Sequence, residues 1–384
     1  MPTPQKPHSS DQTCATRAVA ALLLLVITSA YGTVRAQPRP QATAAPSAGA
    51  ARPPQSRDLR RFRADSFWVR TWLRGGDDEP ELFVEPRQLV VAGGMVAILD
   101  LGTREIFALK RDSGQTQLTL SARGEGPGEF KRPARLLHLG DDFGVIDDAT
   151  ARLTMFAANG TRLWDAPMPD ANVLEAVCML PGARVLIKRA GFDKAIRIVD
   201  SSGRSIAQQT LPISDPKHPP PDFAHTAQLT GPLRDGRCVL TPAFGSTWYV
   251  VDASGKLSPH KYIEPGADAF VSVSTKTLEK GMRTEVRRQT QTSTASPIAR
   301  GAMYIGDTVI VHAGATKRFP YHLLDYYLLP EGQYLYSRRL PVAFVALTIG
   351  PDGTFYGTRI GDETSWVMGF RPTLSAPRRR EKGR

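Results

Sequence analysis

The sequence predicts an all-β fold assembled from six copies of one four-stranded antiparallel unit. Three observations support this prediction. One complete repeat spans residues 121–164, turn signals recur at similar spacing through most of the chain, and an orphan strand precedes the first repeat. Four short antiparallel strands that repeat about every 40–50 residues are typical of a β-propeller blade. We therefore predict a six-bladed β-propeller.

The strands and turns of the complete repeat are predicted from its hydrophobic pattern. It opens with a loop of glycine and proline that no regular element would tolerate. Asn159-Gly160 is a strong hairpin signal, because both residues accept a positive φ at low cost. Apolar or alternating runs separated by tight turns give four predicted strands, at residues 136–139, 143–146, 152–156 and 161–164.

Two kinds of turn mark the copies of this repeat. A small or Gly-Asp-like turn between the inner strands occurs six times, at residues 92–94, 140–142, 181–183, 234–236, 305–307 and 351–353. An outer hairpin tip that ends in glycine occurs five times, at residues 110–114, 157–160, 200–203, 252–255 and 330–332. A sixth tip would fall near Arg371, where the last apolar strand ends. The count predicts six blades, the last of which lacks its own outer strand.

The orphan strand at residues 66–73 supplies the missing element. We predict that it completes the last blade and closes the ring. Closure protects sheet edges that would otherwise pair with other chains.

One blade carries a recognisable motif, a GxGPGEF loop and a proline followed by an aspartate, an arginine, a phenylalanine and a hairpin glycine. These residues are Gly124, Gly126, Gly128, Phe130, Pro133, Asp148, Arg152, Phe156 and Gly160. The motif resembles the NHL-type six-bladed propellers and is most similar to the secreted bacterial six-bladed propeller proteins with a GxGPGEF loop. The resemblance implies the fold and a structural role for Asp148 and Arg152, which would tie a turn to the next strand. It implies no particular activity, because propellers host many unrelated functions.

The ends of the chain predict export. Lys6 and Arg17 precede the apolar stretch 18–30, and Val34-Arg35-Ala36 is a plausible cleavage site. We expect a signal peptide at 1–36, a disordered Pro- and Ala-rich linker at 37–57, the propeller at 58–371 with an insertion at 265–300, and a basic disordered tail at 372–384. The predicted location is secreted or periplasmic.

The net charge of +12 belongs to the two ends of the chain. Residues 64–370 hold 34 basic and 34 acidic residues, so the propeller is neutral. This distribution argues against a nucleic-acid partner. The basic tail could contact an anionic surface or could simply be solvated.

The insertion at 265–300 departs most from the repeat. Leu278, Met282 and Val286 recur every four residues among basic residues, which predicts a short amphipathic helix, although Gly281 weakens that prediction. The insertion is either a lid or docking element, or an ordinary surface loop.

Three cysteines are present, and Cys14 falls in the signal segment. Cys178 and Cys238 lie in apolar strands of successive repeats, at different strand positions. An oxidising compartment would permit a disulfide, but we expect two buried thiols.

Catalytic motifs are scarce. The chain has no GxSxG elbow, and its only asparagines are Asn159 and Asn172, which disfavours the calcium-dependent lactonase site of some six-bladed propellers. The histidines and aspartates of loop 215–225 match no metal-ligand spacing, so no metal site and no cofactor are predicted. We expect a monomeric, non-catalytic binding or scaffold propeller with a protein or glycan partner on one face. The alternative is a calcium-dependent lactonase- or lyase-like enzyme.

Overall fold

The structure is a computed structural model that describes residues 67–121, 129–189, 195–212, 227–243, 245–263, 271–280, 283–292, 299–313 and 323–373. All of them belong to the compact unit Asp58–Arg384. The predicted signal segment, the linker and most of the tail lie outside these ranges and stay predictions. Across the described residues, the model contains no helix long and apolar enough to cross a bilayer.

The first three blades each take four consecutive strands. Blade 1 consists of β2 (Pro86–Ala92), β3 (Met95–Asp100), β4 (Glu105–Lys110) and β5 (Thr116–Ser121). Blade 2 consists of β6 (Pro133–Leu139), β7 (Asp142–Asp147), β8 (Arg152–Phe156) and β9 (Arg162–Pro167). After a short 3-10 helix, Ala171–Val173, blade 3 consists of β10 (Leu174–Leu180), β11 (Arg184–Arg189), β12 (Ala195–Val199) and β13 (Ser205–Thr210).

The remaining blades include the one that closes the ring. Blade 4 consists of β14 (Ala227–Thr230), β15 (Cys238–Pro242), β16 (Thr247–Val251) and β17 (Leu257–Lys261). Blade 5 consists of β20 (Ala299–Ile305), β21 (Thr308–Ala313), β22 (Leu323–Leu328) and β23 (Gln333–Arg339). Blade 6 consists of β24 (Ala346–Ile349), β25 (Phe355–Ile360), β26 (Ser365–Thr373) and, as its outermost strand, β1 (Phe67–Gly75).

The blades form a closed ring, which confirms the predicted fold class. Neighbouring strands within every blade are antiparallel. The first strand of each blade contacts the first strands of both neighbours, so that β2, β6, β10, β14, β20 and β24 surround a central channel. All six predicted inner turns join the first and second strands of a blade, and all five predicted outer tips join the third and fourth.

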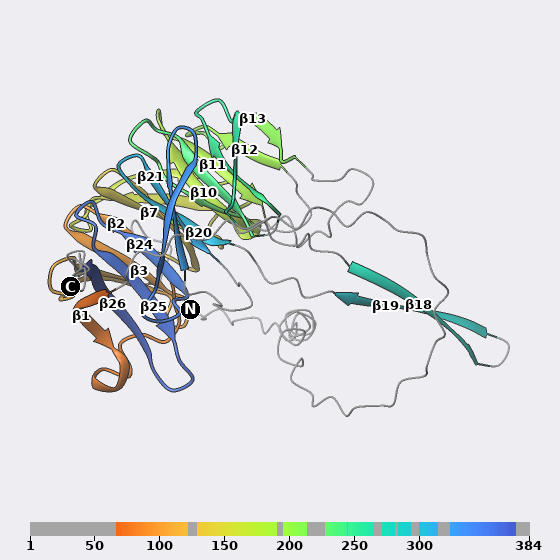
Figure 1. Cartoon of the computed structure of the whole chain (residues 1–384), viewed down its shortest axis with the longest axis horizontal. Helices are drawn as coiled ribbons and strands as arrows, with labels where there is room; N and C mark the ends of the chain where they lie inside the picture. The colour runs from red at the N-terminus through yellow and green to blue at the C-terminus, as the bar shows by residue number, and fades with distance from the viewer. Residues whose placement is uncertain are drawn as a thin grey trace, which may run out of the picture. The chain divides into compact units, whose positions relative to one another are not determined.

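Strand β1 closes the ring by pairing with β26, as the orphan strand predicts. In Figure 1, β1 (orange) runs beside β26 (blue), so the two ends of the described chain meet in one blade. The indole of Trp68 donates to the carbonyl of Arg339 in blade 5, at 2.7 Å. On the other side, Trp72 Nε1 donates to the carbonyl of Arg111 in blade 1, at 2.9 Å. The closing strand therefore binds both neighbouring blades.

The core lies between the blades. Leu153 and Met155 of blade 2, for example, share one apolar cluster with Val177, Met179 and Val185 of blade 3. Further clusters of this kind join the other neighbouring blades. Each blade thus depends on its neighbours to cover its apolar faces.

The prediction of a helix around Leu278 and Val286 is wrong. The segment forms two antiparallel strands, β18 (Val271–Lys280) and β19 (Arg283–Thr292), in which Leu278 is opposite Glu285 and Val286 is opposite Thr277. Valine and threonine are frequent in both strands, and these β-branched residues favour extended backbone. The four-residue recurrence spans the connection between the strands, so it is not a helical period.

The expectation of two free thiols is also wrong. Cys178 of β10 and Cys238 of β15 form a disulfide that joins blades 3 and 4, with their Cα atoms 6.4 Å apart. The first strand of blade 3 contacts the second strand of blade 4, and this contact brings the two cysteines together from different strand positions.

Trp72 tests how strongly the ring depends on its closing strand. The side chain is only 7% exposed and packs on Tyr356, with ring centroids 5.7 Å apart. We expect Trp72→Ala to lower the free energy of unfolding in urea by about 3–5 kcal/mol, because it removes a buried aromatic ring. Phe67→Ala on the same strand, where the side chain is 62% exposed, should change it by less than about 0.5 kcal/mol. Equal effects would contradict the proposed role of Trp72.

The disulfide provides a second test. It links cysteines 60 residues apart, so the chain-entropy relation gives roughly 4 kcal/mol of stabilisation. We expect the double variant Cys178→Ala/Cys238→Ala to lose about this much free energy of unfolding and therefore to unfold at a lower urea concentration. Peptide mapping without reductant should recover the two cysteines in one cross-linked fragment. Two separately alkylated thiols would contradict the assignment.

Candidate functional site

The central channel holds two cavities, one at each end. The cavity at the turn end, about 280 Å³, is lined by residues of the turns between first and second strands, including Gly93, Gly140 and Gly306. The cavity at the loop end, about 470 Å³, is lined by the beginnings of all six first strands. Four residues line both cavities, namely His138, Thr230, Met303 and Thr348. We call the larger cavity the channel mouth.

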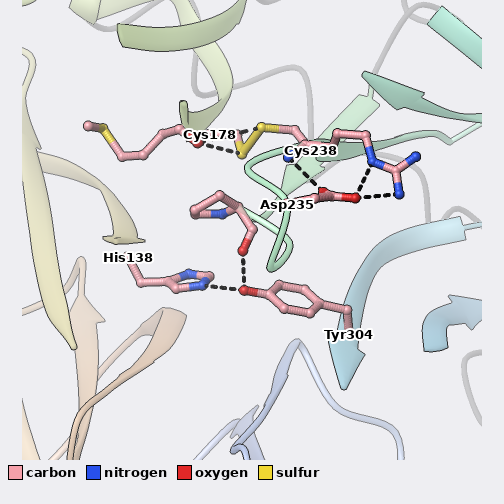
Figure 2. The surroundings of a disulfide bond; sticks show 8 residues. His138, Cys178, Asp235, Cys238 and Tyr304 are labelled. Atoms are coloured by element: carbon pink, nitrogen blue, oxygen red, sulfur yellow. Dashed lines mark hydrogen bonds and ion pairs between the residues drawn. A yellow bond between two sulfur atoms is a disulfide. The ribbon is translucent and has the colours of Figure 1, made fainter. Parts of the chain in front are cut away.

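His138 and Tyr304 separate the two cavities. They come from blades 2 and 5, on opposite sides of the ring, and His138 Nε2 lies 3.2 Å from the Tyr304 hydroxyl. Figure 2 shows this hydroxyl between the imidazole and the carbonyl of Pro232, to which it donates a hydrogen bond. Because the hydroxyl proton is used on the carbonyl, the imidazole must donate through Nε2–H. His138 lines both cavities and Tyr304 lines the one at the turn end, so the hydrogen-bonded pair lies where the two cavities adjoin, and we call it the floor of the mouth.

Burial acts on both members of this floor. It lowers the pKa of His138 to about 4, so the imidazole is neutral at physiological pH. Burial also raises the pKa of Tyr304, so the phenol keeps its proton. The floor is uncharged.

The disulfide lies next to this floor. Gly231 precedes Pro232, and a Cβ added at Gly231 would lie 2.9 Å from Cys178 Sγ. The cross-link therefore packs against the segment that holds the Tyr304 hydroxyl.

A repeated β-bulge shapes the mouth. In blades 1, 2, 3 and 5 the register of the first strand slips by one residue near its start. The extra residue is Arg87, Ala134, Glu175 or Arg300. Bulges bend a strand and re-aim a side chain, and they are frequent near functional sites. Here three of the four place a charged side chain in the lining of the mouth.

The polar side chains of the mouth also join the blades. Gln88 of blade 1 donates to the carbonyl of Ala134 in blade 2 at 3.3 Å. Arg135 of blade 2 donates to the carbonyls of Leu174 (2.7 Å) and Glu175 (3.3 Å) in blade 3. Between later blades, Thr230 donates to Ala302 and Arg300 donates to Phe344, both at backbone carbonyls. These hydrogen bonds hold the lining in place.

The mouth is positively charged. Three arginines (Arg87, Arg135 and Arg300) and one glutamate (Glu175) are among its described lining residues, giving a formal charge of +2. Glu175 lies 3.4 Å from the fully buried Lys188, which opposes its charge. Arg87 pairs with Glu85 at 2.6 Å on the rim. In the lining of the cavity at the turn end, the negative charge of Asp141 and the positive charge of Arg234 sum to zero.

Arg135 lies deepest among the three arginines. Burial lowers its pKa, and the nearby charges of Glu175 and Asp148 raise it. Its hydrogen bonds go to backbone carbonyl oxygens, which are uncharged and therefore leave the positive charge of the guanidinium in place. Three of its five N–H groups are used in this way, so two remain for other acceptors.

The predicted motif residues that fall within the described ranges lie away from the mouth. Gly124, Gly126 and Gly128 are outside the described residues. Phe130 is buried against Phe156, with ring centroids 5.8 Å apart, and Pro133 begins β6. Asp148 forms an ion pair with Arg132. Arg152 Nη2 donates to the carbonyl of Glu129 at 3.2 Å, and Gly160 occupies the hairpin tip with φ +85°.

The carboxylate that ties the turn to the strand is that of Asp147, which the sequence analysis missed. It is buried and accepts hydrogen bonds from the backbone N–H groups of Arg132, Ala149 and Thr150. These hydrogen bonds help to lower its pKa against the opposing effect of burial, which is the largest single influence. Asp100 ties the corresponding turn in blade 1, where it accepts hydrogen bonds from the backbone N–H groups of Val84 and Gly102. The signal is an aspartate at the end of a second strand in successive repeats.

Metal ligands do not gather within the described ranges, where no three His, Cys, Asp or Glu side chains lie together as a metal would require. Loop 215–225, with its histidines and aspartates, lies outside those ranges.

Comparison with known proteins finds similar solved structures but no matching family. No family model matches the sequence, and no curated protein matches it. The solved structure of U3-55K is similar at a TM-score of 0.47 with 11% identity, over 81% of this chain and 100% of that one. Virginiamycin B lyase from Staphylococcus aureus gives 0.46 and 10%, over 80% and 100%. A putative exported protein from Bacteroides fragilis NCTC 9343 gives 0.45 and 11%, over 81% and 99%. The strand order itself establishes that the chain is a six-bladed β-propeller.

The neutral histidine in the floor predicts a pH dependence of stability. Its pKa is about 4 in the folded protein and about 6.5 when unfolded, so between these values the unfolded chain binds more protons. Stability is therefore lost as the pH falls from about 6.5 towards 4, by at most about 3 kcal/mol, since His138 is only partly buried and lines both cavities. Denaturant unfolding from pH 7 to pH 4 should show this loss in the wild type and a shallower one in His138→Gln. Identical pH profiles would contradict it.

Proposed function

We propose that the protein is an exported, non-catalytic binding module that holds its ligand in the channel mouth. The observation that carries the proposal is the cavity itself, about 470 Å³ in volume, with walls of polar and apolar residues and the uncharged His138–Tyr304 pair at its inner end. Its size is that of a small-molecule site. It would equally admit side chains that a partner inserts.

The lining favours binding over chemistry. The arginines of the mouth are engaged with backbone carbonyls or with a carboxylate, which fixes their positions. Both members of the floor are uncharged at physiological pH, because burial opposes protonation of the imidazole and deprotonation of the phenol. Such groups recognise a ligand through fixed donors and charge.

Export is supported by two features. The first 36 residues have the pattern of a signal peptide. The disulfide between Cys178 and Cys238 suits an oxidising compartment. Reading the N-terminus of the exported protein tests this part, because cleavage after Ala36 should leave Gln37 first.

Filling the mouth should abolish binding. Gln228 is an exposed residue of the mouth, and Gln117 is an exposed glutamine on the outer strand of blade 1. The full chain and the variants Gln228→Trp and Gln117→Trp would be incubated with an extract of the extracytoplasmic compartment, re-isolated and analysed by mass spectrometry for retained compounds. We expect the wild type and Gln117→Trp to retain the same compound and Gln228→Trp to lose it.

Two outcomes would contradict this proposal. Identical retention by all three proteins would show that the mouth is not the site. Turnover of an extract compound, together with stoichiometric bound calcium by elemental analysis after dialysis, would instead favour the lactonase- or lyase-like enzyme.

A further inference from the structure

The chemistry of the mouth indicates what it binds. We propose that the channel mouth recognises a ligand with at least two carboxylate groups, held between Arg135 and Arg300. This inference rests on the proposed function and adds the class of ligand to it.

The two arginines face the channel from opposite sides of the ring. Arg135 precedes His138 by three residues on β6, and Arg300 precedes Tyr304 by four residues on β20. Because the His138 and Tyr304 side chains meet across the channel, their strands lie directly opposite. At about 3.3 Å per residue, the arginines stand roughly 10–13 Å above the floor. A ligand in the mouth would meet one guanidinium on each side.

Charge selects an anion. The formal charge of the lining is +2, and its one described acidic side chain, Glu175, is already opposed by Lys188. A positive cavity with low-dielectric walls concentrates anions. Guanidinium groups match carboxylates in a planar, two-point geometry.

The rest of the lining combines amide groups with leucine, valine and alanine side chains. Gln88 and Gln228 add amide groups to the wall. Phe, Tyr and Trp are absent from the lining of the mouth within the described ranges, so it offers no aromatic face for a ring to stack on. This composition favours a polycarboxylate over a sugar.

Calorimetry with the full chain tests the proposal, using citrate and a capped tetraglutamate peptide as probes. Acetate, glycerol and spermidine serve as monocarboxylate, neutral and cationic controls. We expect citrate, the peptide or both to bind, acetate to bind at least about tenfold more weakly, and glycerol and spermidine not to bind. Binding should weaken with added salt. Citrate alone would indicate a small organic acid, and the peptide alone would indicate acidic side chains of a protein partner.

Two matched pairs of variants locate the site. Arg300→Gln should weaken binding at least about tenfold, while Arg132→Gln, which removes a surface ion pair outside the mouth, should change it less than about twofold. Arg300 also joins two blades, so Gln228→Glu provides a second variant that adds a negative charge without touching an arginine. It should weaken binding, and Gln117→Glu should not.

The contradicting outcomes separate this inference from the proposed function. Polycarboxylate binding that is insensitive to Arg300→Gln and Gln228→Glu would overturn the inference, and so would the absence of binding. If the compound retained from the extract is nevertheless lost in Gln228→Trp, the mouth remains a binding site and only the ligand class is wrong. If Gln228→Trp also retains that compound, both the proposed binding site and the proposed ligand class are wrong.

Discussion

The pairing of β1 with β26 is the constraint on which the rest of the structure depends. A propeller blade cannot cover its own apolar faces, so each of the six needs two neighbours. Without β1, blade 6 would present the edge of β26 and lose the indole hydrogen bonds that reach Arg339 and Arg111. Only a closed ring brings His138 and Tyr304 into contact across the channel, since they lie on opposite blades.

In the proposed function, the same side chains of the mouth serve stability and recognition. Gln88, Arg135 and Arg300 each donate to the backbone of the following blade, and each also lines the cavity. Such double use fixes the positions of the donors before a ligand arrives, which lowers the entropic cost of binding. Between blades 3 and 4 the disulfide takes the place of such a hydrogen bond. A rigid frame with a charged, preformed cavity is the physical basis for the proposed binding function.

Local patterns made the fold predictable from the sequence. Turns such as Gly140-Asp141 and Asn159-Gly160 are determined by the backbone conformations that their own residues allow, and all the inner turns and outer tips were predicted correctly. The closing strand could be predicted because the last repeat visibly lacked its fourth strand. The hairpin at 271–292 was missed because Leu278 and Val286, eight residues apart, imitate a helical period while lying on two strands.

The site was less accessible from the sequence because it depends on neighbours that only the ring creates. Cys178 and Cys238 occupy different strand positions, and only the packing of β10 against β15 brings them together. Arg135 and Arg300 read individually as surface residues at the start of strands. Their common level becomes visible only when the strand register, bulges included, is known. Aligning the repeats by their inner turns would have shown that polar residues recur there.

Hydrogen–deuterium exchange of the full chain, with and without a saturating concentration of whichever polycarboxylate probe binds it, citrate or tetraglutamate, tests most directly whether the mouth is the functional site. The account predicts slower amide exchange at the beginnings of β6 and β20, beside Arg135 and Arg300, and unchanged exchange in the outer strands β5 and β9. Protection confined to outer strands or to the turn end of the channel, with none at the mouth, would contradict it.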